Sequence, residues 1–136
     1  MDLGLPTYRV EIVAPCADKS ATPGPIDIAH LRKFTLGNRA LELEVLAMFA
    51  KQVPTILERL TQAVTEKSWY EAAHTLKGSA RAVGAREIAS LAERAEHIGV
   101  AGQERRAVMT ALAVAVRDAA DFVDALVATN LAPRSA

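Results

Sequence analysis

The spacing of apolar residues from Asp27 onward constrains the fold of this chain more than any other feature. Leucine, isoleucine, valine and alanine recur at intervals of three and four residues, which is typical of an amphipathic α-helix rather than a strand. Aromatic residues make up only 4% of the chain, and a composition rich in alanine and poor in aromatics favours helices. The pattern therefore predicts an all-α protein.

Local start and stop signals divide the helical pattern. Asp27 and Asn38 suit N-cap positions, because their side-chain oxygens accept hydrogen bonds from the first turn of a helix. Ser68, with Glu71 three residues later, matches a capping box at the start of a helix that should end near Gly84, and Gly37 suits a left-handed helix end. Helices are predicted over residues 27–34, 39–64, 68–84, 86–98 and 104–128.

Short connections between these helices imply antiparallel neighbours, so the predicted architecture is an up-and-down four-helix bundle with a short extra N-terminal helix. Residues 1–25 contain four prolines and are predicted to form an extended or disordered N-terminal arm. The helical domain is expected over residues 26–130, followed by a C-terminal tail at 131–136.

Composition excludes several classes of protein. The 136 residues fit one domain, and 16 basic against 16 acidic side chains argue against a nucleic-acid-binding protein. Cys16 is the only cysteine, so an internal disulfide is impossible. The N-terminus lacks the basic and apolar regions of a secretory signal, and no apolar run is long enough to span a membrane. A cytoplasmic location without membrane insertion is expected.

The segment around His74 carries the candidate chemistry. At about 100° per residue, one side of its helix gathers an apolar stripe and the imidazole points away from it. Tyr70, Lys77, Gly78 and Arg81 share the side of the histidine. The predicted buried stripe consists of Trp69, Ala72, Ala73, Leu76, Ala80 and Val83.

Gly78 is unusual at this place, because a glycine inside a helix costs about 1 kcal/mol relative to alanine. It leaves open space one turn after His74, and Lys77 supplies a cation nearby. A solvated histidine is mostly neutral at cytoplasmic pH, so its free ring nitrogen is a nucleophile. These three features suit a phosphohistidine: the imidazole is accessible, a cation can stabilise the phosphoryl oxygens, and the missing side chain leaves room for a partner's active site. Phosphoryl transfer depends mainly on such positioning and charge stabilisation.

Residues 74–80, with the sequence HTLKGSA, and Gly84 ten residues after the histidine resemble the motif of histidine phosphotransfer (HPt) domains. The order of helices over residues 26–128 resembles that family as well. The resemblance implies an all-helical phosphoryl carrier of a two-component phosphorelay, which is not an enzyme and needs no cofactor of its own. Its partners would be receiver domains, which supply an aspartate and Mg²⁺, and a hybrid or other sensor histidine kinase.

The resemblance also implies roles for single residues. His74 would be phosphorylated at Nε2, Lys77 would be the cation that faces the phosphate, and Gly78 would provide clearance for the partner. Glu96 matches a position near the histidine, where its carboxylate could accept a hydrogen bond from Nδ1. The docking surface is expected on the outer face of the 68–84 helix and on part of the 39–64 helix. The predicted partner-binding residues are Tyr70, Arg81, Ala85, Arg86 and Glu96, and a monomer suffices.

Other functions fit the residues less well. A metal site formed by His30, His74 and His97 lacks close ligand spacing. An autonomous kinase or phosphatase would need a phosphate-binding loop, and the order of residues 77–79 is wrong for one. The histidine-bearing domain of a chemotaxis-type kinase, detached from its catalytic part, stays open. The main alternative is a helical adaptor that binds receiver or kinase domains without carrying phosphate.

Overall fold

The computed structural model describes residues 24–131, and these residues form five α-helices. The predicted all-α class is confirmed. Residues 1–23 of the predicted arm and 132–136 of the predicted tail lie outside the described residues. The helices are α1 (Ile28–Thr35), α2 (Arg39–Gln62), α3 (Glu66–Val83), α4 (Arg86–Ile98) and α5 (Arg105–Leu131).

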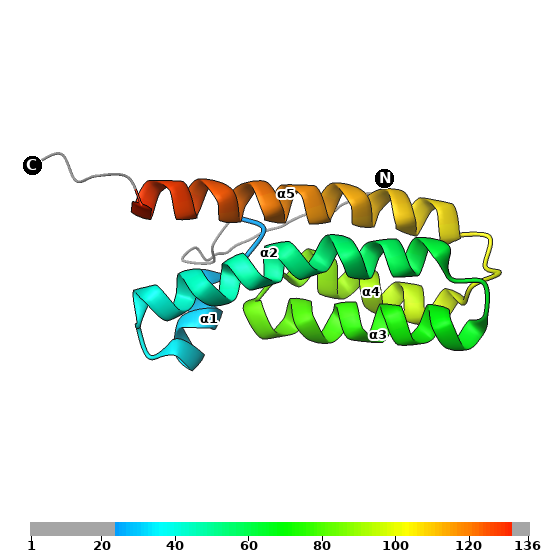
Figure 1. Ribbon diagram of the computed structural model, residues 1–136. Coiled ribbons are helices and arrows are strands. Elements are labelled where there is room, and N and C mark those ends of the chain that lie inside the picture. Colours follow the sequence, from blue (N-terminus) through cyan, green and yellow to red (C-terminus); the bar gives the residue numbers. More distant parts are fainter. Residues whose placement is uncertain (1–23, 132–136) are drawn as a thin grey trace, which may run out of the picture.

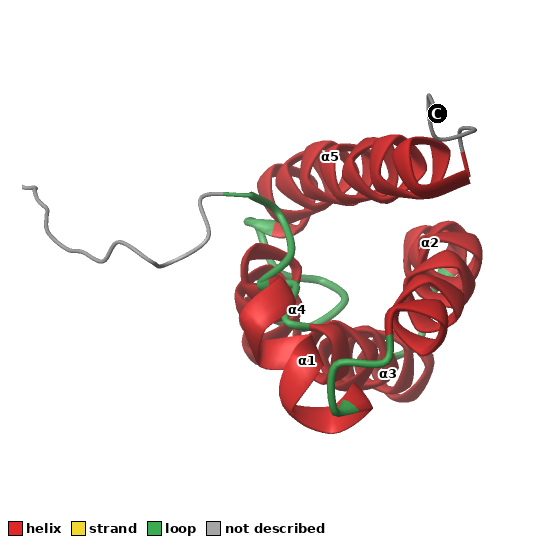
Figure 2. Cartoon of the chain, turned by 90° about the vertical axis from the view of Figure 1, so that its left-hand side faces the viewer, coloured by secondary structure: helices red, strands yellow, loops and turns green. Residues whose placement is uncertain are grey.

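The four long helices lie side by side around a shared core (Figures 1 and 2). Helix α2 contacts α3 and α5, and α4 contacts the same two helices from the other side. The short α1 packs against α2 and α3 at one end of the molecule. Within the described part of the chain, no helix combines the length and apolarity needed to cross a membrane.

Three predicted helix boundaries are confirmed. The side chain of Asp27 accepts a hydrogen bond from the His30 amide at 3.1 Å, and that of Asn38 accepts from the Leu41 amide at 3.0 Å. Gly84 ends α3 with φ of 82° in the left-handed region. A Cβ atom there would lie 2.8 Å from the Asp27 carbonyl oxygen, so both the conformation and the close approach of α1 require glycine.

The start of α3 was predicted wrongly. The N-cap residue is Thr65, not Ser68, because the Thr65 hydroxyl accepts from the Ser68 amide at 3.0 Å and the Ser68 hydroxyl accepts from the Thr65 amide at 3.3 Å. Ser68 therefore occupies the third helical position of a capping box that begins three residues earlier. Glu71 instead pairs with Lys67, one turn before it, at 2.8 Å.

The prediction that Ala85 lies on the outer face of α3 is also wrong. Because Gly84 turns the chain out of the helix, Ala85 no longer follows the periodicity of α3. Its amide donates to the Ala80 carbonyl at 2.8 Å, and its side chain is fully buried at the start of α4. Ala85 therefore has no surface to offer a partner.

The buried face of α3 matches its prediction residue for residue, from Trp69 to Val83.

The predicted end of α2 is wrong, because Ala63 adopts an extended backbone with ψ of 131°. Val64 consequently points into solvent and is 84% exposed, although an uninterrupted helix would have turned it inward.

Trp69 and Arg105 hold neighbouring helices against α3. The buried indole of Trp69 donates from Nε1 to the Ala95 carbonyl on α4 at 2.7 Å. The Arg105 guanidinium lies 4.7 Å from the centre of the indole ring and donates to the carbonyls of Thr61 and Ala63 at the end of α2. The Arg105 contacts pair carbonyls that the end of α2 leaves without partners in the helix. The Trp69 contact holds the part of α4 that carries Glu96 beside α3.

Candidate functional site

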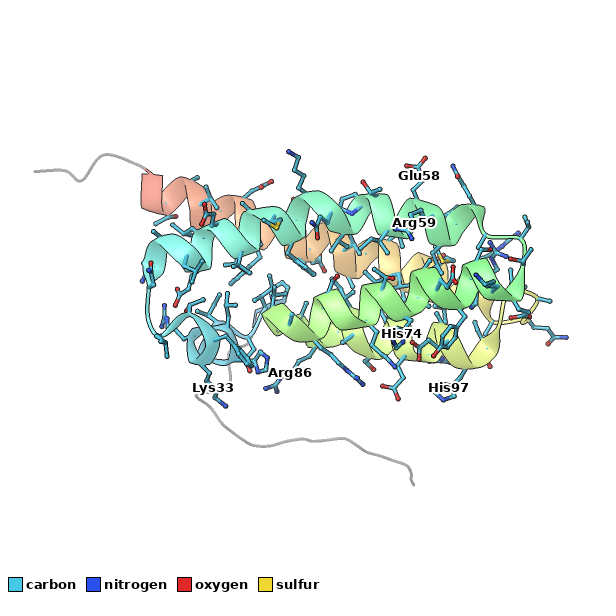
Figure 3. The ribbon with its side chains drawn as sticks, turned by 60° about the horizontal axis from the view of Figure 1, so that its bottom comes forward. Lys33, Glu58, Arg59, His74, Arg86 and His97 are labelled. Carbon is cyan, nitrogen blue, oxygen red and sulfur yellow. The ribbon has the colours of Figure 1, made fainter. Side chains whose placement is uncertain are left out.

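His74 lies on the outer side of α3, and its side chain is 60% exposed. The nearby residues Ala73 and Leu76 are fully buried, so the helix presents the imidazole to solvent while its other side is anchored in the core. Figure 3 shows His74 on α3, with Arg86 nearer the α1 end of the molecule and His97 nearer the opposite end. The predicted outward orientation of His74 is confirmed.

Glu96 on α4 joins His74 to Lys77. One carboxylate oxygen lies 2.9 Å from Nδ1 of His74, and the other accepts from the Lys77 ammonium at 2.8 Å. An ionised carboxylate only accepts hydrogen bonds, so the proton of a neutral imidazole resides on Nδ1. The lone pair of Nε2 is then free for an electrophile.

The environment of the Glu96 carboxyl keeps it ionised. Burial alone would raise its pKa, since the side chain is only 8% exposed. Hydrogen bonds from Lys77 and His74, together with the positive charge of Lys77, outweigh burial and hold the pKa of Glu96 below its ordinary value. The carboxylate is therefore available to His74 throughout the neutral range.

This pKa shift predicts a pH dependence of stability. A carboxyl whose pKa is lower in the folded state stabilises the protein above its unfolded-state pKa, and the contribution disappears as pH falls through the folded-state pKa. We expect the difference in unfolding free energy between the native protein and a Glu96→Gln variant to be largest near pH 7 and to shrink as the pH falls below about 4.5. Urea unfolding of both proteins at several pH values measures this difference, and a difference independent of pH would contradict the ionised state.

Lys77 lies closer to the protein interior than the sequence indicated. Its side chain is 15% exposed, and its ammonium contacts Glu96 directly. The position was predicted to face a phosphate, whereas in this state its charge compensates the nearly buried carboxylate. The sequence contained a signal for the contact between Lys77 and Glu96. Because Lys77 is three residues after His74, both lie on the same face of a helix, and one carboxylate on a neighbouring helix can reach them both.

Gly78 adjoins open space. A Cβ atom built on it meets no other atom within 4 Å, in contrast to the crowded Gly84. Gly78 also has no positive φ, so neither the backbone conformation nor the packing of this chain requires glycine at that position. The fold alone therefore does not explain why this helix has a glycine at position 78, where alanine would make the helix more stable.

Among the other predicted docking residues, Tyr70 contacts His74, whereas Arg81 and Arg86 pair with acidic residues further toward the α1 end of the molecule. Arg81 pairs with Glu93 at 3.0 Å, and Arg86 pairs with Asp27 at 2.6 Å, so each arginine already has an acidic partner on this chain. Both side chains remain exposed. Tyr70 is 49% exposed, and its ring stacks on His74, a contact that the sequence analysis missed although the two residues are one helical turn apart.

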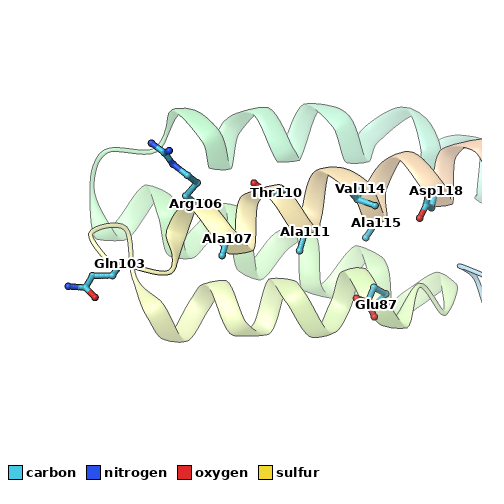
Figure 4. Close-up of a pocket in the computed structure, with 9 residues that line it drawn as sticks. All are labelled: Glu87, Gln103, Arg106, Ala107, Thr110, Ala111, Val114, Ala115 and Asp118. Carbon is cyan, nitrogen blue, oxygen red and sulfur yellow. The ribbon is translucent and has the colours of Figure 1, made fainter. Parts of the chain in front are cut away.

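A hollow of about 920 Å³ lies elsewhere, between α4 and α5 (Figure 4). Alanine side chains of α5 form much of its wall, with Glu87 on the α4 side, and His74 takes no part in its lining.

Among the residues that the structure describes, no group of three or more histidine, cysteine or acidic side chains is arranged to hold a metal ion. His30 and His97 instead contact backbone carbonyls of Arg81 and Glu93.

The fold and the site thus define a class of protein: a helical bundle that presents one histidine on the outer face of a core helix. Comparison with known families agrees, since residues 44–129 match the model of the Hpt domain. The chain belongs to the Hpt domain family. Searches of curated proteins and of solved structures returned no match.

Membership of this family has direct consequences for function. Hpt domains are phosphoryl-carrying modules of two-component signalling and are not enzymes with a catalytic site of their own. The family works with receiver domains and kinases of phosphorelays. A role for this chain in histidine phosphotransfer follows from its membership of the family.

Proposed function

We propose that this protein accepts a phosphoryl group on Nε2 of His74 from a receiver-domain aspartate or a kinase, and passes it to another receiver. The observation that carries the proposal is the 2.9 Å contact between Nδ1 of His74 and Glu96 on an imidazole that is 60% exposed. It commits one ring nitrogen to the protein and leaves the other for chemistry. The contacts among α2 to α5 support the up-and-down four-helix arrangement as part of the same proposal.

The transfer step follows from the site. Nε2 attacks the phosphorus of the phospho-aspartate, the bond between phosphorus and the aspartyl oxygen breaks, and the aspartate leaves as a carboxylate. The proton on Nδ1 stays between the ring and Glu96, whose negative charge offsets the positive charge that the ring acquires. Lys77 holds Glu96 and places a cation beside the transferred group. Transfer to the next receiver reverses these bond changes.

The receiver completes the site in this proposal. It contributes the aspartate and binds Mg²⁺, so this chain needs neither a metal nor a nucleotide. Exposed Tyr70, Arg81 and Arg86 belong to the surface that meets the receiver. One histidine per chain requires no second copy, and we propose a monomer that works in the cytoplasm.

Incubation with a phosphorylated receiver domain and Mg²⁺ tests the proposal. The expected result is the appearance of acid-labile label on His74 with loss of label from the receiver. A helical adaptor, the alternative function, would bind the receiver and leave the label where it was. Binding without transfer to any receiver or from any kinase would therefore overturn the carrier and favour the adaptor.

Gly78 provides a separate prediction about docking. Because a Cβ at Gly78 meets open space, Gly78→Ala is expected to raise the unfolding free energy by about 0.5–1 kcal/mol. Gly78→Leu should keep the fold but block transfer, since its side chain occupies the space that a receiver needs. Gly84→Ala is the matched control and should destabilise by about 1–2 kcal/mol or more, because its φ is positive and Asp27 is close.

Denaturant unfolding and the transfer assay together check these three variants. If Gly78→Leu still accepts phosphate at the native rate, the clearance at Gly78 has no part in docking.

A further inference from the structure

Tyr70 and His74 form a stacked pair on the outer face of α3. Their ring centres are 5.5 Å apart and their planes differ by 15°. The two residues are separated by four positions, which places their side chains one above the other on a helix. Offset stacking at this distance is a favourable arrangement of two π-systems.

The stack acts on the imidazole from a different direction than Glu96 does. Glu96 contacts Nδ1 at the edge of the ring, and the Tyr70 ring stacks against one of its two faces. An edge contact alone leaves the ring free to tilt about the line of the hydrogen bond. A face contact restrains that tilt, so the two contacts together define the direction in which Nε2 points.

We propose that Tyr70 is a positioning residue for phosphoryl transfer: its ring holds the imidazole of His74 in the orientation that aims Nε2 at an incoming phosphorus. This inference rests on the proposed function and assigns Tyr70 a role that precedes any contact with a partner. In-line displacement depends strongly on the alignment of the attacking atom, so a loosened ring reacts more slowly with every donor. Tyr70 itself makes no bond to the phosphoryl group.

Two substitutions separate the ring of Tyr70 from its hydroxyl. Tyr70→Phe keeps the stacked face, and Tyr70→Ala removes it. Since Tyr70 is 49% exposed, neither substitution empties the core, and circular dichroism verifies that the helices remain. Nitrogen chemical shifts and side-chain coupling constants of His74, measured by NMR without any donor, report the tautomer and the rotamer of the imidazole.

Reactivity is measured with phosphoramidate, a small donor that needs no docking surface. In this reaction Nε2 forms the new bond to phosphorus and the bond between phosphorus and the donor nitrogen breaks. The donor nitrogen is already protonated in phosphoramidate and leaves as neutral ammonia with the electron pair of that bond. Tyr70→Ala is expected to average the His74 rotamers and to slow labelling by about 2- to 10-fold, with Tyr70→Phe close to the native protein. With a phosphorylated receiver the slowing is expected to be at least as large, because Tyr70 also belongs to the proposed docking surface.

Two outcomes would overturn the inference. Native rotamer populations of His74 in Tyr70→Ala would show that the stack does not orient the ring. Unchanged labelling by phosphoramidate with slower transfer from a receiver would make Tyr70 a docking residue only. The NMR measurement is independent of phosphate, so failure of the carrier function itself, seen as no label on His74 from any donor, is distinguishable from failure of the stacking role.

Discussion

His74→Gln is expected to abolish phosphate acceptance while the helices and their packing stay intact. Glutamine has no nucleophilic ring nitrogen, so no phosphoramidate bond to the side chain can form. The native side chain is 60% exposed and lies outside the core, although its hydrogen bond to Glu96 and its stacking on Tyr70 are lost. The unfolding free energy should change by no more than about 1 kcal/mol.

Labelling from a phosphorylated receiver with Mg²⁺, followed by circular dichroism of the same sample, checks both halves of this prediction. His97→Gln is the matched control, because His97 is also exposed, lies on the neighbouring helix and contacts the backbone carbonyl of Glu93. It should accept label like the native protein. Residual acid-labile label on the His74→Gln variant would place the phosphorylated residue elsewhere.

Leu76→Ala should have the opposite effect, with a large loss of stability at a residue only two positions from the histidine. The Leu76 side chain is fully buried in the core that α3 shares with its neighbours. Truncation removes apolar contacts and leaves a cavity that a packed interior fills only partly, at a cost of about 2–5 kcal/mol. The net unfolding free energy of a domain is roughly 5–15 kcal/mol, so this cost is a large fraction of it.

Urea unfolding measures the effect of Leu76→Ala, and Thr75→Ala serves as its neighbour control. Thr75 is exposed on the same helix, so its substitution should change the unfolding free energy by about 0.5 kcal/mol or less. A cost below about 1 kcal/mol for Leu76→Ala would mean that the core around α3 repacks freely.

Local chemistry accounts for the elements that were predictable. Asp27, Asn38 and Gly84 act within one helical turn, so a short stretch of sequence is enough to recognise them. The same reasoning failed at Ser68, because Thr65 and Ser68 form a second cap pair in the same stretch. Propensity does not rank two overlapping caps, and the packing of Trp69 against α4 accompanies the earlier start.

Contacts between helices were harder to predict. Glu96 was predicted near His74 only by resemblance to a family, and its second contact, with Lys77, was not predicted. Ala85 was misplaced because helical periodicity was extended past the turn at Gly84. The buried Glu42, held by Arg32 and Thr35 from α1, was missed entirely, since a charged residue in an amphipathic pattern ordinarily indicates solvent.

The amino-acid sequence by itself determined the helices, the buried side of α3 and the outward direction of His74, because periodicity and capping act over neighbouring residues. Tertiary structure alone decided which nitrogen of His74 is free, where the charge of Lys77 goes and how strongly Glu96 is held as a carboxylate. These properties depend on the distance between α3 and α4, and that distance follows from packing across the whole core.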